Sequence, residues 1–161
     1  MMREALSAFE VRFAEEKDIP GIMEITREAF ARYKETTGAS RLEALEETAE
    51  DIGRDIENKL VLIAMSDGES VGCVRVELMS DGMAYLTRFA VRVTSQNNGI
   101  GKAMMNHVDK LMKKNGIKRI SLYTASKATA LMRFYYGRGF YVESTDTVRG
   151  YIRAKLVKDY E

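Results

Sequence analysis

The sequence predicts a mixed α/β (α+β) fold, with a single, mostly antiparallel sheet and helices packed on both of its faces. The pairs Asp67-Gly68 and Asp81-Gly82 are hairpin turn signals, and they separate short strand-like runs. Downstream of the second turn the patterns follow the order β-α-β-α-β. Residues 1–161 have the length of one ordinary domain, so we expect a single domain.

The first third of the chain predicts a short strand and two helices. Val11–Phe13 is the strand, and Asp18 can cap the helix that follows, with Pro20 in its first turn. A capping box of Ser40 and Glu43 is expected to begin the second helix. The outer face of that helix is acidic and carries Glu43, Glu46, Glu47, Glu50 and Asp51. We interpret this face as a solubilising surface, with attraction of a cationic ligand as the alternative.

Three strands are expected around the two hairpin turns. Leu60–Met65 is a continuous apolar run, which is typical of a strand covered on both faces. Between the turns, Val74, Val76 and Leu78 alternate with polar or mixed positions, which predicts a half-buried strand. Together with the run Leu86–Val93, these segments predict an antiparallel meander.

The second half of the chain alternates helices and strands. Apolar residues at helical spacing predict a helix over Gly99–Lys114, and Asn115-Gly116 ends it. A strand over Ile117–Tyr123 and a helix over Ala128–Tyr136 follow. Phe140–Ser144 and Arg149–Val157 are the candidate closing strands.

Composition excludes several classes of protein. The 25 basic and 24 acidic residues nearly cancel and form no basic tail, so no nucleic-acid partner is expected. The longest apolar run, Leu60–Met65, is far shorter than a bilayer span, and the first residues do not resemble a secretory leader. The one cysteine, Cys73, is consistent with a reducing cytoplasm, and a single histidine gives no support for a metal site. A homodimer is left open.

The most informative segment is the glycine turn between the run Leu86–Val93 and the following helix. Gly99 and Gly101 stand where a helix begins, and the free N–H groups of a helix N-terminus can bind a pyrophosphate. A dinucleotide fingerprint requires a third glycine where Met104 stands, and an acidic residue about 20 positions later that is also missing. A P-loop requires Ser or Thr after its lysine, but Ala103 follows Lys102.

The spacing that does fit is Gln-x-x-Gly-x-Gly. It is formed by Gln96, Gly99 and Gly101 and is preceded by the strand residues Phe89-Ala90-Val91. This arrangement resembles the acetyl-CoA-binding motif of the GNAT superfamily of N-acetyltransferases. A GNAT-like acyl-CoA N-acyltransferase fold is therefore what the resemblance implies.

A second segment carries the same resemblance. Residues 131–140 are similar to the late helix of the family and its exit, with Tyr135 five residues before Phe140 and Gly139 between them. Leu131 replaces the usual alanine, and Ala128 stands where the family often has an asparagine that contacts the cofactor. The two motifs have the expected order and separation.

The resemblance implies the activity and the site. The implied activity is acetyl transfer from acetyl-CoA directly to a primary amine of a small molecule or peptide. The alternative is a non-catalytic acyl-CoA-binding sensor or interaction module of the same fold. The implied pyrophosphate contacts come from Gln96, Asn97, Asn98, Gly99, Ile100, Gly101 and Lys102. The main chain of Phe89, Ala90 and Val91 would pair with the pantetheine arm, and Tyr135 would protonate the leaving thiolate.

The general base and the acceptor site stay open. Some family members have a glutamate near the start of the fourth strand, where this chain has Tyr85. Glu77 or a chain of waters could take its place. By the resemblance, the first two helices, their loop and the closing hairpin would form the acceptor site. Cys73 and His107 are interpreted as structural residues.

Overall fold

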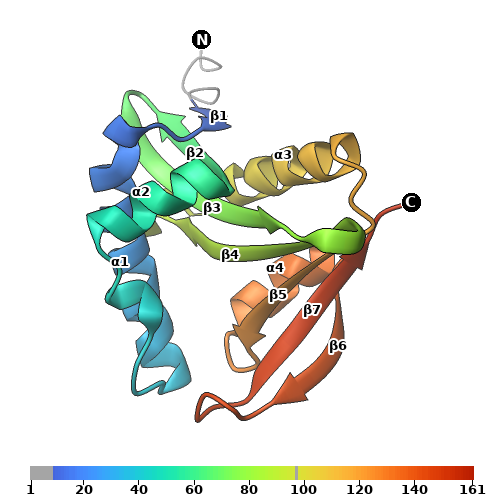
Figure 1. The fold of residues 1–161 in the computed structure, drawn as a ribbon. Helices are drawn as coiled ribbons and strands as arrows, with labels where there is room; N and C mark the ends of the chain where they lie inside the picture. Colours follow the sequence, from blue (N-terminus) through green and yellow to red (C-terminus); the bar gives the residue numbers. More distant parts are fainter. Residues whose placement is uncertain (1–8, 97) are drawn as a thin grey trace.

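The computed structural model describes residues 9–96 and 98–161, and these form a seven-stranded sheet with four α-helices (Figure 1). The strands are β1 (Phe9–Phe13), β2 (Leu60–Ser66), β3 (Glu69–Leu78), β4 (Met83–Val91), β5 (Arg119–Ala125), β6 (Tyr141–Asp146) and β7 (Arg153–Asp159). The helices are α1 (Ile19–Thr37), α2 (Ala49–Asn58), α3 (Ile100–Lys114) and α4 (Thr129–Gly137). The strand order is β1-β2-β3-β4-β5-β7-β6, in which β4 and β5 run parallel and the other neighbours antiparallel. The predicted fold class is confirmed.

Both predicted hairpins are present. Asp67 and Gly68 adopt φ values of +51° and +83° between β2 and β3, as a two-residue hairpin turn requires. Asp81 and Gly82 are also left-handed, with φ of +61° and +75°, in the short turn between β3 and β4. The meander of β2, β3 and β4 is confirmed.

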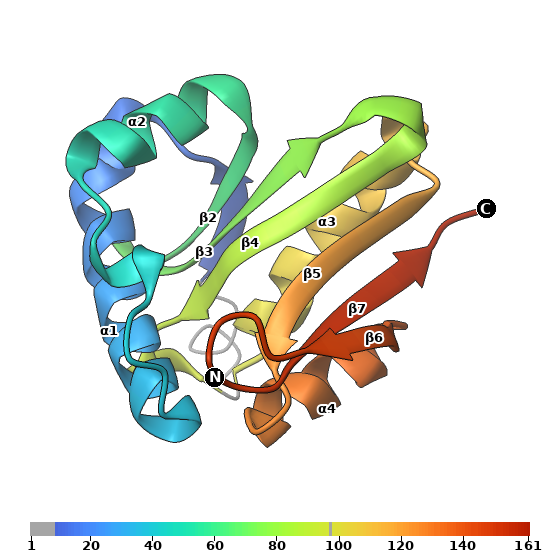
Figure 2. The same cartoon turned by 60° about the horizontal axis from the view of Figure 1, so that its bottom comes forward.

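Helices cover both faces of the sheet (Figures 1 and 2). On β2, Val61 and Ile63 pack with α1 and α2, whereas Leu62 and Ala64 pack in the core that α3 and α4 share. This two-sided burial explains why the second strand is apolar at successive positions. Among residues 9–96 and 98–161, no helix has the length and apolar character of a membrane span.

The predicted start of the second helix is wrong. Glu43–Leu45 forms a short 3₁₀ turn, and α2 begins only after Thr48. The backbone N–H of Asp51 donates to Thr48 Oγ1 at 3.2 Å, and the N–H of Thr48 donates to the Asp51 carboxylate at 2.9 Å. This capping box lies directly before the apolar positions of α2, so it begins the helix in place of Ser40 and Glu43.

The predicted half-buried third strand is also wrong at its centre. Arg75 is 0% exposed, and its guanidinium donates to both carboxylate oxygens of Glu47 at 2.5 and 2.7 Å. Asp55 of α2 accepts a third hydrogen bond from Arg75 at 2.9 Å. Glu47 therefore belongs to the linker between α1 and α2, with its side chain turned inward to Arg75, and is not part of a solvated acidic helix face. The linker folds over β3, which local sequence patterns do not reveal.

Asp18 occupies the predicted N-cap position of α1, but its carboxylate does not cap that helix. It accepts two hydrogen bonds from Arg12 of β1, at 2.8 and 3.0 Å, and one from the N–H of Glu15 at 2.7 Å. Asp18 therefore joins β1 to the start of α1. At the other end of the chain, the last strand begins at Arg153 rather than at Arg149, so residues 147–152 form the loop between β6 and β7.

Candidate active site

The sheet opens between β4 and β5 (Figure 2). These strands pair only where Met83–Tyr85 lies beside Arg119–Ser121, and among the described residues their pairing ends there. On the other edge of β4, the register with β3 shifts between Cys73 and Arg75, so that β4 has one extra residue there. Arg88 lies in this bulge with φ of +53°. Beyond Tyr85, backbone groups of β4 that face β5 are therefore free of a strand partner.

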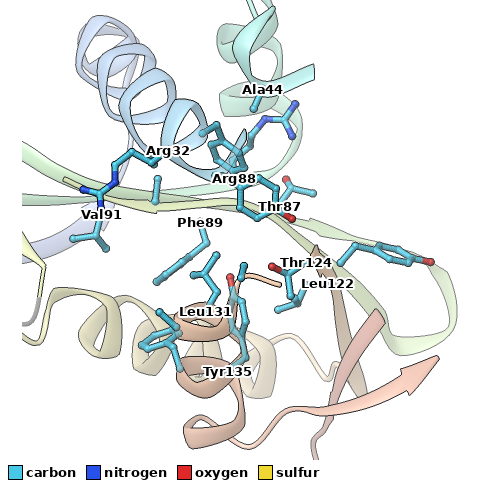
Figure 3. Close-up of a pocket in the computed structure, with 18 of the residues that line it drawn as sticks. Arg32, Ala44, Thr87, Arg88, Phe89, Val91, Leu122, Thr124, Leu131 and Tyr135 are labelled. Atoms are coloured by element: carbon cyan, nitrogen blue, oxygen red, sulfur yellow. The ribbon is translucent and has the colours of Figure 1, made fainter. Parts of the chain in front are cut away.

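A cavity of about 690 Å³ occupies this opening. Its walls come from the free edge of β4, the start of α3, the first turns of α4, the second half of α1 and the loop between β6 and β7. Figure 3 shows that Phe89 and Tyr135 approach the cavity from opposite sides, from β4 and α4. Segments that are far apart in the sequence thus converge at one site.

The glycine turn forms the end of the cavity beside α3. Gly99 is the N-cap of α3, with φ of +81°, and no described atom outside Gly99 and its chain neighbours lies within 4 Å of a Cβ placed on it. The helical hydrogen bond from the N–H of Ala103 to the carbonyl of Gly99, at 3.0 Å, closes the first turn. The N–H groups of Ile100, Gly101 and Lys102 precede it and have no acceptor within the helix. Asn97, also expected at this site, lies outside the described residues.

A glycine is needed at position 101 for a different reason than at position 99. A Cβ on Gly101 would lie 3.1 Å from Cζ of Phe89 and 3.3 Å from Cζ of Phe134. The rings of Phe89 and Phe134 stack with centroids 5.2 Å apart. Gly101 therefore lets the start of α3 pack against this aromatic pair, whereas Gly99 supplies the left-handed backbone of the turn.

The other residues of the predicted cofactor site lie where main-chain contacts are feasible. The side chains of Ala90 and Ile100 are buried in the core, so their backbones alone can face a ligand. Gln96 donates from Nε2 to the carbonyl of Val91 at 3.3 Å and so joins the turn to the end of β4. Asn98 and Lys102 are exposed.

Tyr135 lies on α4 within an aromatic cluster. Its ring packs edge-on against Phe89, Phe134 and Phe140, with centroid distances of 5.9, 5.5 and 5.6 Å, and the residue is only 4% exposed. The hydroxyl is directed into the cavity, toward β4 (Figure 3). Burial, with a smaller effect of the nearby phenol of Tyr33, raises the pKa of Tyr135 above its usual range. The phenol is therefore protonated at neutral pH and can donate a proton or a hydrogen bond.

Tyr33 of α1 is a cavity residue that the sequence did not single out. Its hydroxyl accepts a hydrogen bond of 2.7 Å from the N–H of Ala125, at the end of β5. Burial raises the pKa of this phenol as well. Tyr33 thus connects α1 to β5 across the opening of the sheet. Its place on the apolar face of α1 resembles ordinary packing, so no sequence signal distinguished it.

The sequence also did not single out the arginines Arg88, Arg149 and Arg153, which line the cavity together with Tyr85. Arg149 lies in the turn before β7, where Gly150 adopts φ of +86°, and Arg153 is the first residue of β7. No local sequence pattern distinguishes these arginines from ordinary surface residues.

The other candidates from the sequence lie elsewhere. Glu77 is the register partner of Tyr85 on β3 but does not line the cavity. Burial raises the pKa of Cys73 to about 11, so this thiol is protonated in the core at neutral pH. Within the described part of the chain, no group of three or more His, Cys, Asp or Glu side chains could hold a metal ion.

The model of the acetyltransferase (GNAT) family matches residues 20–140 of the 161, so the chain belongs to this family. Among curated proteins, it is 32% identical over 87 residues to a spermidine N(1)-acetyltransferase of Thermoplasma acidophilum. That match covers 54% of this chain and 53% of the relative, so the chain spans about half the length of the curated relative.

Two solved structures show the same fold over nearly the whole chain. One is the PaiA N-acetyltransferase of Thermoplasma acidophilum in complex with coenzyme A, with a TM-score of 0.83 and 25% identity over 95% of this chain and 99% of that chain. The other is the ribosomal-protein-S18-alanine N-acetyltransferase of Escherichia coli, with a TM-score of 0.76. Its identity is 16% over 94% of this chain and 93% of that chain, so it shows the fold alone.

Proposed function

We propose that this protein is an N-acetyltransferase that moves an acetyl group from acetyl-CoA directly to a primary amine of a small molecule or peptide. The observation that supports this most directly is the cavity between β4 and β5, where the free strand edge, the glycine turn and Tyr135 meet. Membership of the GNAT family and the likeness to a structure that contains coenzyme A support the same conclusion. The one free cysteine, Cys73, is consistent with a cytoplasmic location.

The residues present fit acetyl-CoA. The start of α3 offers N–H groups without helical acceptors, and the space around Gly99 is open where a pyrophosphate would approach. Lys102 adds a positive charge at the same turn. The edge of β4 at Phe89, Ala90 and Val91 offers main-chain groups that a pantetheine arm could pair with, as an added strand would.

Bound in this way, acetyl-CoA would supply an activated acetyl group. A backbone N–H on the free edge of β4 would donate to the acyl oxygen as negative charge develops there. Tyr135, which is buried and protonated, would deliver its hydroxyl proton toward the leaving sulfur. The cavity walls would hold the amine against the acetyl group, so the protein contributes mainly position and electrostatics.

The experiment that tests this proposal combines binding with turnover. Isothermal titration should show binding of acetyl-CoA and CoA, and a panel of amines should give release of CoA thiol with at least one of them. Tyr135→Phe should keep CoA affinity yet reduce turnover roughly 100-fold, the scale for a positioned acid. Tyr136→Phe is the matched control, because Tyr136 is the neighbouring tyrosine on α4 and is 49% exposed.

The outcomes separate the proposal from its alternative. Binding of CoA without thiol release from any amine would favour the non-catalytic sensor. An unchanged turnover in Tyr135→Phe would remove this tyrosine from the chemistry while leaving the activity standing. Failure to bind either acetyl-CoA or CoA would contradict both functions.

A further inference from the structure

Basic side chains outnumber acidic ones in the lining of the cavity. Among the described residues, one acidic side chain, Glu43, belongs to its lining. The basic lining side chains are Arg32, Arg88, Lys102, Lys127, Arg149 and Arg153. A cavity of this sign favours anions, and the phosphates of acetyl-CoA can account for part of the excess only if the cations lie at their end.

Five of these six basic residues divide between two ends of the cavity. Lys102 belongs to the start of α3, and Arg32 reaches from α1 toward Val91 beside the glycine turn (Figure 3). These two therefore lie at the end proposed for the phosphates. Arg88 points the other way, toward Ala44 in the linker between α1 and α2 (Figure 3).

Three arginines converge on Tyr85 at this second end. Burial raises the pKa of the Tyr85 phenol, and the charges of Arg153, Arg149 and Arg88 each act in the opposite direction. The guanidinium carbon of Arg153 lies 4.1 Å from the ring centroid of Tyr123, and the ring of Tyr123 packs edge-on against that of Tyr85 at 6.1 Å. Tyr85 therefore places an uncharged phenol beside three cationic side chains at this end of the cavity.

The carboxylates that neutralise these arginines are set back from the cavity or exposed. Arg153 pairs with Asp146 at 2.9 Å and Arg88 with Glu47 at 3.4 Å, and neither of these acids lines the cavity. Arg149 pairs with Glu43 at 3.6 Å, where both side chains are largely exposed to solvent. A ligand in the cavity therefore meets the guanidinium groups of Arg88 and Arg153 before it meets their partners, whereas Glu43 lines the cavity beside Arg149.

We propose that the acceptor amine carries an anionic group, a carboxylate or a phosphate, which Arg88, Arg149 and Arg153 bind. Guanidinium groups suit this role because their planar N–H pairs match both kinds of oxyanion. A polycation would be disfavoured by the same charges. The relative from Thermoplasma acidophilum is named for spermidine, so spermidine is the most informative competitor. This proposal rests on the acetyltransferase function proposed above.

The test uses amines that differ only in the anionic group. Lysine and cadaverine share their terminal amine and carbon chain, and lysine adds a carboxylate. Phosphoethanolamine and ethanolamine form the corresponding pair for phosphate, and spermidine is the polycation. We expect kcat/KM to be about tenfold or more higher for at least one anionic amine than for its counterpart without the anionic group and for spermidine. Arg149→Gln should lower that preference about fivefold or more, and Arg153→Gln should do the same.

Arg133→Gln is the matched control, because Arg133 is exposed on α4 and does not line the cavity. A higher kcat/KM for cadaverine or spermidine than for both anionic amines would overturn the proposal, as would an anionic preference that survives both cavity variants. Thermal shifts of the CoA-loaded protein with the same amines measure acceptor binding without turnover. Stabilisation by an anionic amine that is lost in Arg149→Gln would support the anion site even if the protein proves non-catalytic. No stabilisation by either anionic amine would refute it.

Discussion

Glu47→Gln is the substitution that best tests the buried charges of this fold. The change keeps the shape of the side chain but removes the negative charge that faces Arg75. Arg75 is fully buried, and Glu47 is its bidentate partner, with a side chain only 8% exposed. The neighbouring Glu46 offers a matched control, because its side chain is 49% exposed and pairs with Arg41, which is itself exposed.

The size of the effect follows from what remains around Arg75. Breaking a buried ion pair by removing one partner costs about 3–5 kcal/mol, because the other charge stays buried. Asp55 still accepts from Arg75 at 2.9 Å, so we expect a loss near the lower end, about 3 kcal/mol of unfolding free energy. For a chain of this length, that loss corresponds to a decrease in Tm of roughly 6–12 °C.

Urea unfolding followed by circular dichroism measures this difference directly. Glu46→Gln should leave the transition nearly unchanged, since exposed ion pairs contribute little. The double variant Arg75→Met/Glu47→Leu should recover much of the stability lost in Glu47→Gln, because it removes both buried charges. A loss below about 1 kcal/mol in Glu47→Gln, or one equal to that of Glu46→Gln, would refute the role assigned to this pair.

Two further predictions concern the glycine turn and the start of α1. Gly101→Val should lower the unfolding free energy by about 2 kcal/mol, because its side chain must displace the rings against Gly101. Gly99→Asn should fold normally in the same urea titration, because asparagine tolerates φ of +81° and the space there is open; the reverse order of stabilities would contradict this. The hydrogen bonds from Arg12 hold the pKa of Asp18 below its usual range, so its stabilising effect is present above about pH 4 and is lost as the pH falls further. Asp18→Asn should therefore be less stable than the unmodified protein at pH 7 and equal to it near pH 2; a gap that persists at pH 2 would show a cause other than charge.

The sequence predicted the features that depend on neighbouring residues. The hairpin at Asp67-Gly68 and the glycine turn at Gly99 each follow from backbone conformations that few residues adopt. The start of α2 shows the limit of such signals. Ser40 with Glu43 and Thr48 with Asp51 both satisfy the capping pattern, and only the apolar residues that follow the second box decide between them.

The features that the sequence did not predict depend on contacts between distant segments. Arg75 lies in an alternating strand pattern that ordinarily places such a residue in solvent. Its burial requires the linker that carries Glu47, 28 residues earlier, to fold over β3. Arg88 and Arg149 likewise come together only because β4 and the loop after β6 meet at the opening of the sheet. Neither arginine stands out in the sequence, yet both charges lower the pKa of the Tyr85 phenol.

Arg88 pairs with the buried Glu47 and also lines the cavity. One substitution can separate its effect on stability from its effect on the acceptor. Arg88 adopts φ of +53°, which is strained for a residue with a side chain, and its guanidinium lies 3.4 Å from Glu47. Arg88→Gly removes that strain together with the guanidinium, while Glu47 keeps Arg75 as its partner. We therefore expect the unfolding free energy to stay within about 1 kcal/mol, because the relief of strain offsets the lost ion pair. In the same variant, kcat/KM for the preferred anionic amine should fall about fivefold or more. A large loss of stability would mean that the arginine side chain, rather than the backbone of the bulge, holds β4 in place; unchanged kinetics would remove Arg88 from the acceptor site.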